Sequence, residues 1–341
     1  MWHGFKTEDE LETVLSEPTP AVVAALGRLS GDIVILGVAG KMGPTLARMA
    51  RRASDAAGVA RRIIGVARFS SGNEATLQAN GIETLRCDLL DEDAVAQLPD
   101  APNVIFMTGT KFGTTGNEAS TWAMNSFLPG LICRRYRRSR IVALSTGNVY
   151  GLTAVEDKGS READRCQPVG EYAMSCLGRE RLFEHFGRSL GIPTAIIRLN
   201  YACELRYGVL VDLAQRVLAG EPIDLGMGFF NTLWQGDANA MVLRAFDVAC
   251  VPPCVVNVTG PEQLSTRSVG ELLGRRMNRP VRFIGTESDK ALLSDARRGL
   301  ELLGPPRVSA AQMIEWIADW VALGNRTFGK PTHYESREGD F

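Results

Sequence analysis

The sequence predicts an α/β protein in which a doubly wound parallel sheet carries a smaller C-terminal lobe. Two observations lead to this expectation. Short apolar runs alternate with amphipathic helical segments from residue 32 to about residue 199, and this alternation is typical of parallel βαβ units. A glycine-rich turn also follows the first apolar run directly. The chain of 341 residues is long enough for one large or two modest domains.

Apolar runs of strand length define the expected sheet. They lie at 33–36, 63–66, 84–86, 104–107, 141–144, 195–199 and 255–258. A helix is expected at 44–56, after the first strand, and helical segments separate most of the others. We therefore expect a sheet domain at 31–200, to which a segment near 234–260 returns.

The remaining residues are expected to form the lobe and an N-terminal extension. Residues 201–233 and 261–341 are assigned to the lobe, with helices at 209–220, 268–277 and 310–323. The spacing of Trp316 and Trp320 in the last helix indicates core packing. Residues 1–30 have an amphipathic helical pattern, and we expect them to cover an edge of the fold or an oligomer interface.

Composition excludes several classes of partner. With 38 basic and 39 acidic side chains, the net charge of -1 gives no global field to attract nucleic acid or an anionic membrane. No stretch reaches the roughly 20 apolar residues that a membrane span requires. The seven cysteines form no CxxC pair and have no metal-ligand spacing with the three histidines, so we expect reduced thiols and no metal. Because the first 30 residues lack a signal-peptide pattern, a cytoplasmic location is expected.

The glycine-rich turn predicts a dinucleotide site. Residues 37–43 read Gly-Val-Ala-Gly-Lys-Met-Gly and connect an apolar strand to a helix. In this context the first glycine permits the tight turn, the second lets backbone approach a pyrophosphate, and the third lets helix and strand pack closely. The helix N-terminus then faces the phosphates. The expected cofactor contacts in this turn are Gly37, Ala39, Gly40, Lys41, Met42 and Gly43.

The end of the second strand indicates which dinucleotide is preferred. Selectivity for NAD(H) requires a carboxylate there to bind the ribose hydroxyls, but residues 67–71 read Ala-Arg-Phe-Ser-Ser. The guanidinium of Arg68 and the hydroxyl of Ser70 suit a 2'-phosphate instead. We therefore expect NADP(H), with NAD(H) as the other possibility.

Further segments carry a resemblance to a known family. Residues 144–151 read Leu-Ser-Thr-Gly-Asn-Val-Tyr-Gly, and residues 171–180 read Glu-Tyr-Ala-Met-Ser-Cys-Leu-Gly-Arg-Glu. With the glycine spacing, they resemble the extended short-chain dehydrogenase/reductase family of NAD(P)-dependent epimerase/dehydratase type, over about residues 31–325. The resemblance implies that Tyr172 is the general acid/base and contacts the cofactor, and that Thr146 bonds the reacting substrate oxygen. It also implies that Asn125 supports the active-site backbone and that Asp88 contacts adenine, with Leu89 and Thr108 beside the cofactor.

One family residue is missing. The tyrosine is normally followed four residues later by a lysine that lowers its pKa, and here that position is Cys176. Lowering a tyrosine pKa from about 10 to about 7 requires roughly 4 kcal/mol of electrostatic help, which a neutral thiol does not supply. Lys111, in the loop after the fourth strand, is the candidate replacement; its other interpretation is a solvated loop lysine. Cys176 is a poorer candidate for a nucleophile, because no histidine lies near it in sequence.

These features predict an oxidoreductase or epimerase acting on a sugar, sugar-nucleotide or polyol-like substrate. Asn148 replaces a carboxylate of the related dehydratases and disfavours that reaction. The polar side chains expected to bind substrate hydroxyls are Asn148, Asn200, Asn231 and Trp234, with Gln235 also a candidate. A homodimer is expected. The alternative is a cofactor-binding protein with little or no turnover, and the loss of the lysine motivates it.

Overall fold

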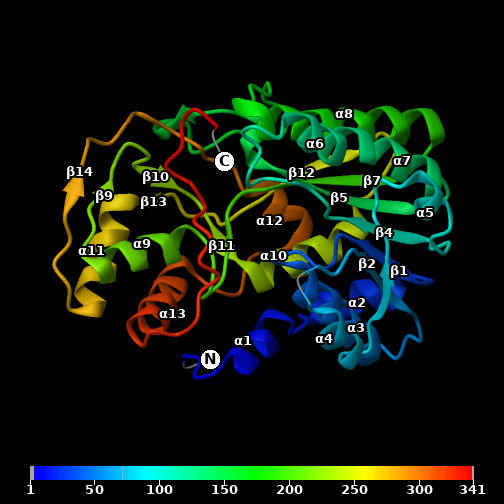
Figure 1. Cartoon of the computed structure of the whole chain (residues 1–341), viewed down its shortest axis with the longest axis horizontal. Coiled ribbons are helices and arrows are strands. Elements are labelled where there is room, and N and C mark those ends of the chain that lie inside the picture. Colours follow the sequence, from blue (N-terminus) through cyan, green and yellow to red (C-terminus); the bar gives the residue numbers. More distant parts are fainter. Residues whose placement is uncertain (1–3, 71, 340–341) are drawn as a thin grey trace.

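The computed structural model describes residues 4–70 and 72–339, and its centre is a parallel sheet of seven strands. The strand order is β12-β7-β5-β4-β1-β2-β3. The bounds are β1 Ile33–Leu36, β2 Ile63–Ala67, β3 Glu83–Arg86, β4 Asn103–Phe106, β5 Arg140–Thr146, β7 Thr194–Leu199 and β12 Cys254–Val258. Each run predicted to be a strand belongs to this sheet, so the predicted doubly wound α/β fold is confirmed (Figure 1).

Helices cover both faces of the sheet (Figure 1). One layer contains α2 Pro20–Arg28, α3 Gly43–Ala56, α10 Gln235–Arg244 and α12 Arg297–Leu303; the other contains α5 Glu92–Ala96, α7 Leu128–Arg135 and α8 Gly170–Leu190. Strand β1 shows why both layers are needed. Ile33 and Ile35 pack into one core cluster, whereas Val34 and Leu36 pack into the other. Alternate side chains of a central parallel strand point to opposite faces, and both faces must be covered.

A smaller helical lobe lies beyond the carboxyl ends of the strands (Figure 1). Its helices α9 Val209–Ala219, α11 Thr266–Met277 and α13 Ala310–Ala322 pack against one another. Helix α1 Glu8–Leu15 adds Leu11 and Leu15 to the lobe's core, and both side chains are fully buried. Phe5 also packs there, with its ring 5.1 Å from that of Trp316. Within the predicted N-terminal extension, Phe5 and α1 therefore complete the core of the lobe, whereas α2 packs on the sheet.

Further short elements lie between these helices and strands, including 3-10 turns at Gly147–Val149, Val155–Asp157 and Ala245–Asp247. The others are given next. They are the helices α4 Glu74–Ala79 and α6 Glu118–Trp122, and the two-residue strands β6 Thr153–Ala154, β8 Ala202–Cys203, β9 Ile223–Asp224, β10 Phe229–Phe230, β11 Leu233–Trp234, β13 Leu264–Ser265, β14 Phe283–Ile284 and β15 Lys290–Ala291. The short strands form paired bridges in and around the lobe. Helix α6 continues through a π-helical turn, Ala123–Phe127, into α7. Such turns are rare and often mark functional sites.

Residues 325–339 form an extended segment, which we call the strap, and it connects the lobe to the start of α8. The backbone N–H of Phe328 donates to the carbonyl of Arg206. Thr332 donates to Asp212 on α9 from its backbone nitrogen (2.8 Å) and from its hydroxyl (2.6 Å). At its far end the backbone of Gly339 lies so close to Gly170 that a Cβ on Gly170 would come within 2.5 Å of the Gly339 oxygen. The strap therefore crosses from one half of the molecule to the other.

A buried ion pair ties α8 to the sheet. Arg198 on β7 and Glu180 on α8 pair at 2.7 Å, with side chains that are 4% and 0% exposed. Ser145 donates to the same carboxylate at 2.6 Å, and Arg198 also donates to the hydroxyl of Tyr150 at 2.7 Å. Because a buried charge without its partner is costly, this network fixes the position of α8 against β5 and β7.

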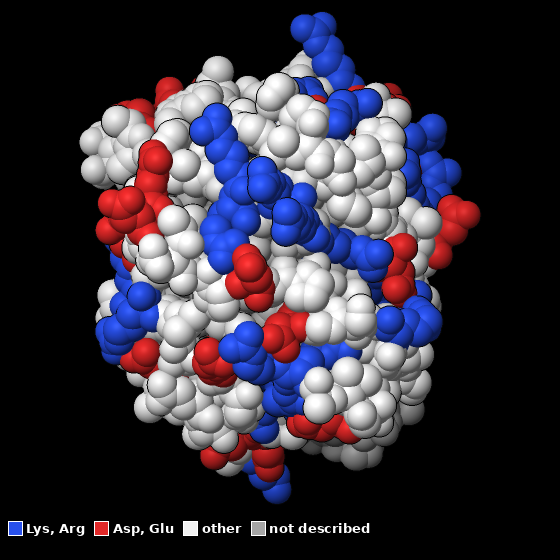
Figure 2. Space-filling view, turned by 90° about the vertical axis from the view of Figure 1, so that its right-hand side faces the viewer, with Lys and Arg blue, Asp and Glu red and all other residues white. Residues whose placement is uncertain are grey.

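Although the net charge is only -1, the charged side chains are distributed unevenly over the surface. Figure 2 shows a band of basic side chains on the side of the molecule away from the lobe. Residues 134–140, from the end of α7 to the start of β5, include five arginines: Arg134, Arg135, Arg137, Arg138 and Arg140. None of the helices in the described ranges has the length and apolar character needed to cross a membrane. Within the same ranges, no group of three or more acidic, histidine or cysteine side chains is placed to hold a metal ion.

Candidate active site

The turn between β1 and α3 can only be built from glycine at two positions. Gly37 has a φ of +86°, and a Cβ there would lie 2.7 Å from the Oγ1 of Thr108. A Cβ on Gly43 would lie 2.0 Å from the carbonyl oxygen of Val38. No side chain caps the N-terminus of α3, so its first N–H groups are available to an anion. Among the described residues, the buried Oγ1 of Thr108 also has no hydrogen-bond partner. The turn therefore fits a dinucleotide pyrophosphate.

A cavity of about 300 Å³ adjoins this turn at the ends of β2 and β3. The predicted residues that line it are Gly37, Ala39, Gly40, Arg68, Ser70, Asp88, Leu89 and Thr108. Arg68 is exposed, and its guanidinium lies 4.0 Å from the carboxylate of Asp88. Asp88 also accepts a hydrogen bond from the backbone of Leu90 at 3.1 Å. The residues predicted for the adenosine end of the cofactor thus lie around one cavity.

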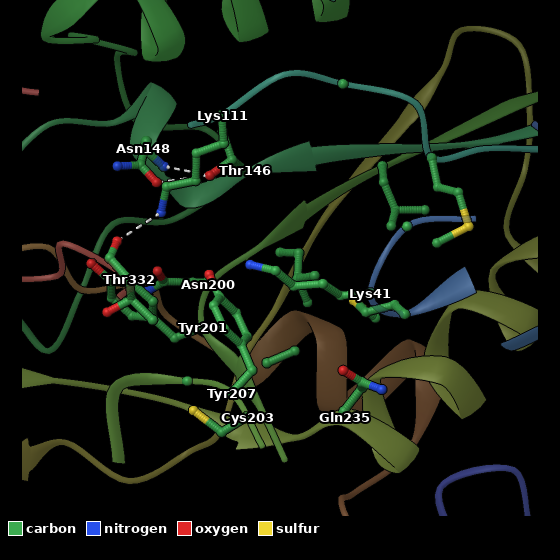
Figure 3. A pocket seen from close by; sticks show the side chains of 18 of the residues that line it. Lys41, Lys111, Thr146, Asn148, Asn200, Tyr201, Cys203, Tyr207, Gln235 and Thr332 are labelled. Carbon is green, nitrogen blue, oxygen red and sulfur yellow. Dashed lines mark hydrogen bonds between the residues drawn. The ribbon is translucent and has the colours of Figure 1, made fainter. Parts of the chain in front are cut away.

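A second cavity of about 300 Å³ lies at the carboxyl ends of β5 and β7, facing the lobe (Figure 3). The predicted residues that line it are Gly40, Lys41, Met42, Lys111, Thr146, Asn148, Tyr172, Asn200 and Gln235. Tyr207 of the lobe and Thr332 of the strap also line it, and the sequence analysis had selected neither. Both cavities share Gly40, Met107 and Gly109 in their walls. The two sites are therefore continuous, as a dinucleotide reaching from one to the other requires.

Thr146 and Tyr172 meet in this second cavity. The Tyr172 hydroxyl is hydrogen-bonded with the side chains of Thr146 and Cys176. Thr146 in turn donates to the Oδ1 of Asn148 at 2.9 Å (Figure 3). Burial, followed by the neighbouring thiol of Cys176, raises the pKa of Tyr172 above its ordinary value. The tyrosine is therefore neutral unless a positive charge or a bound group offsets the burial.

Arg179 is a functional candidate that the sequence analysis missed. It follows Tyr172 by seven positions on α8, so both side chains lie on the same face of the helix. Its buried guanidinium donates to the carbonyl of Leu144 at 2.8 Å and to the Oδ1 of Asn125 at 2.7 Å. This charge acts to lower the pKa of Tyr172, against the larger effect of burial. The spacing along α8 was a signal that could have found it.

Asn125 lies in the π-helical turn and holds the loop after β4. Its side chain exchanges two hydrogen bonds with the backbone of Thr110, each at 2.9 Å. It also donates to the hydroxyl of Ser175 on α8 at 3.0 Å. This arrangement fixes the backbone next to Lys111.

Lys111 is not a solvated loop lysine. Its amine donates to the backbone oxygen of Thr332 at 3.4 Å and lies 5.8 Å from the centre of the Tyr172 ring. Burial lowers the pKa of Lys111 to about 8. Lys41 reaches the same cavity from the glycine turn, and burial followed by repulsion from Lys111 lowers its pKa to about 7. The amines of Lys41 and Lys111 thus both face the cavity that contains Tyr172.

Two residues predicted to bind substrate lie elsewhere. Trp234 is fully buried in the lobe core, with its ring 5.5 Å from that of Trp316, and the prediction of a substrate contact was wrong. Asn231 also does not line the Tyr172 cavity in the described structure. It accepts a hydrogen bond from Asn200 at 2.8 Å and donates to the backbone oxygen of Ser294 at 2.6 Å. Asn231 therefore orients the side chain of Asn200 without lining the cavity itself.

The sheet order, the glycine turn and the Thr146–Tyr172 pair define an α/β protein of the Rossmann class, similar to the extended short-chain dehydrogenases. A model of the NAD dependent epimerase/dehydratase family matches residues 33–224. The chain belongs to this family. No curated protein matches the sequence.

Solved structures with the same fold include two bacterial epimerases. UDP-glucuronic acid 4-epimerase from Bacillus cereus, in complex with UDP-glucuronic acid and NAD, is 19% identical with a TM-score of 0.72, and the alignment covers 86% of this chain and 99% of that chain. UDP-glucose 4-epimerase from Thermotoga maritima, with UDP-glucose, is 17% identical with a TM-score of 0.70, and the coverage is again 86% and 99%. At this identity the likeness shows the fold.

Proposed function

We propose that the chain is an NAD(P)-dependent oxidoreductase or epimerase acting on a sugar, sugar-nucleotide or polyol-like substrate. The observation that carries this proposal is the hydrogen-bonded pair of Tyr172 and Thr146, which lies in a cavity continuous with the glycine turn. A proton donor beside a second hydroxyl, at the carboxyl end of a parallel sheet, is placed to act on one substrate oxygen.

The proposed cofactor is NADP(H). Bound there, it would donate or accept a hydride. The uncapped N-terminus of α3 would hold the pyrophosphate, and Thr108 would find the hydrogen-bond partner that its hydroxyl lacks among the described residues. Arg68 and Ser70 would bind the 2'-phosphate. Because the Bacillus cereus relative was solved with NAD, NAD(H) is the second candidate.

Tyr172 would exchange a proton with the substrate oxygen, and Thr146 would hold that oxygen in place. For the tyrosine to lose its proton, a positive charge must offset its burial. Cys176 adds none, so we assign this charge to Lys111, 5.8 Å from the tyrosine ring, with Arg179 as a second cation on the same helix as Tyr172. Asn148 and Gln235 would contact substrate hydroxyls.

The second candidate is an NADP(H)-binding protein with little or no turnover. It is favoured by the replacement of the family lysine with Cys176 and by the direction of the Tyr172 pKa, which burial raises. For either candidate we expect a homodimer in the cytoplasm, and light scattering of the purified chain tests the oligomeric state.

The discriminating experiment follows the absorbance of the reduced nicotinamide. Purified protein with NADP⁺ or NADPH is offered polyols, sugar lactones and nucleotide sugars, and the wild type is compared with Tyr172→Phe and Thr146→Val. Oxidoreductase catalysis predicts a net absorbance change, whereas epimerase catalysis regenerates the cofactor and predicts interconversion of sugar epimers. Both substitutions should abolish either activity while dinucleotide affinity stays the same. A wild type that binds the dinucleotide but produces neither an absorbance change nor an epimer from any of the substrates offered would favour the second candidate.

A further inference from the structure

The cavity around Tyr172 is bounded by four parts of the chain. Its floor lies at the carboxyl ends of β5 and β7, the glycine turn contributes residues 40–42, and the lobe contributes residues 207–209. The strap supplies the fourth part through Thr332. In Figure 3, Lys41 of the turn and Thr332 of the strap approach the cavity from different sides. A ligand at Tyr172 therefore lies between the glycine turn and the strap.

The strap is fixed to the molecule on both sides of Thr332. Before it, the backbone N–H of Phe328 donates to a carbonyl of the lobe, and after it the ring of Tyr334 is buried in the lobe core. Thr332 itself donates to Asp212 at 2.8 Å and 2.6 Å, and its carbonyl accepts from Lys111. The strap is therefore a wall of the cavity rather than a solvated tail.

This wall limits the space for a ligand. The cavity has a volume of about 300 Å³, at the lower end of the range for ligand pockets. Because it continues into the cavity at the glycine turn, the nicotinamide end of the proposed cofactor would share this volume. The remaining space suits a molecule of monosaccharide size. A nucleotide attached to that sugar would have to displace the strap.

One aromatic ring of the lobe, that of Tyr207, is already covered on one face. The Nζ of Lys41 lies 3.3 Å from the centre of the Tyr207 ring and 4.4 Å from the centre of the Phe112 ring. Proteins often hold a nucleotide base by stacking it on an aromatic face. A base could stack on this face of Tyr207 only if Lys41 moved away.

Neutral amides of the cavity remain available to hydroxyl groups. Asn148 accepts from Thr146 through its Oδ1, and Asn200 donates to Asn231 through its Nδ2. Among the described residues, the Nδ2 of Asn148 and the Oδ1 of Asn200 have no hydrogen-bond partner. One donor and one acceptor are thus left for the hydroxyls of a ligand.

We infer that the substrate is a free polyhydroxy compound of monosaccharide size, and that the strap, at Thr332, excludes sugar nucleotides. This inference rests on the proposed function and narrows its substrate class. Thr332 determines specificity because it lines the cavity, and Asp212 is a positioning residue that acts through Thr332.

Titration calorimetry on the full chain saturated with NADP⁺ tests the inference. The probes are three matched pairs, D-glucose with UDP-glucose, D-galactose with UDP-galactose and D-glucuronate with UDP-glucuronate, together with UDP alone. We expect at least one free sugar to bind at least about tenfold more tightly than its UDP conjugate, because a conjugate that the strap holds out of place loses several hydrogen bonds of its sugar. UDP alone should not compete with that sugar.

Two variants of α9 test the contact responsible. Asp212→Ala removes the acceptor of both hydrogen bonds that hold Thr332, so the strap would detach more often. Because apparent affinity is proportional to the population of the conformation that binds, the affinity for the UDP conjugate should rise at least about tenfold. Gln215→Ala is the matched control. It removes a 3.0 Å contact of the same helix with Thr327 of the strap, outside the cavity, and should leave the affinity ratio of each pair unchanged.

Hydrogen exchange shows whether Asp212→Ala detaches the strap without unfolding the lobe. The amides of residues 328–334 should exchange faster than in the wild type, while those of α13 should not change. A strap that exchanges no faster would overturn the role assigned to Asp212.

Other results would overturn the inference as a whole. They are binding of every UDP conjugate at least as tightly as its free sugar, no binding of any free sugar, and a detached strap in Asp212→Ala with unchanged affinity for the UDP conjugate. Since these affinities need no turnover, a free sugar that binds without hydride transfer or epimer formation would count against the proposed function alone.

Discussion

Replacing Lys111 with methionine tests the source of the positive charge at Tyr172. The amine lies 5.8 Å from the centre of the tyrosine ring, over which a phenolate charge is partly delocalised. At that separation, with an effective dielectric constant of about 20, a unit charge stabilises the phenolate by about 3 kcal/mol. This corresponds to a change of about two pH units in the tyrosine pKa. The pKa of Lys111 is lowered to about 8 beside a neutral Tyr172, and a phenolate at that position would raise it again, so the ammonium would persist while the tyrosine titrates.

The assay is the pH profile of hydride transfer on the best substrate from the screen. In the direction of ketone reduction, neutral Tyr172 donates its proton, so the rate falls as pH rises through the tyrosine pKa. Lys111→Met should move this basic limb upward by about two pH units and lower turnover at least about tenfold. Cys176→Ala removes no charge and should leave the limb where it is. A Lys111→Met enzyme with the wild-type limb would refute the reasoning and leave Arg179 as the source.

Three further changes test other parts of the structure. Arg68→Asp should turn a preference of at least about tenfold for NADP(H) into a preference for NAD(H) in calorimetry; equal wild-type affinities would contradict the assignment. Glu180→Gln should lower the free energy of unfolding in urea by about 3 to 5 kcal/mol, because Arg198 would stay buried without its partner; a negligible loss would refute this. Lys41→Met should stabilise the dinucleotide-free chain. The pKa of Lys41 falls from 10.5 to about 7 on folding, so the unfolded chain holds an extra proton between these values. The gain in thermal midpoint should therefore be largest below about pH 7 and vanish above 10.5, and a pH-independent gain would disprove it.

The sheet and the glycine turn could be predicted because the information is local. Strand β1 is a run of four apolar residues, and the turn that follows it has its own glycine spacing. The strap could not be predicted, because it has no periodic pattern and its position depends on contacts such as Thr332 with Asp212, 120 positions away in sequence. Because Lys111 is buried partly by its contact with the strap, its burial could not be predicted from the sequence either.

A motif fixes both the residue and its element for Thr146 and Tyr172, and the structure places both side chains at one cavity, while their roles stay predictions. Sequence reasoning failed where packing between distant segments decides the position of a side chain. Trp234 was expected to hydrogen-bond a substrate hydroxyl, yet its ring packs against Phe5 and Trp316 from opposite ends of the chain. Arg179 could not be selected from the motif, because it lies beyond the position of the missing lysine on the same helix.

The strap has a kinetic consequence. It is anchored to the lobe through Asp212 and reaches the start of α8 at Gly170, so the two halves cannot rotate apart without lengthening the path between these anchors. Detachment of the strap would break the hydrogen bonds of Thr332, and if ligand exchange between the halves requires that detachment, it limits the rate. Ligand entry and product departure should then share one slow step, visible in stopped-flow as an association rate that levels off as ligand concentration rises.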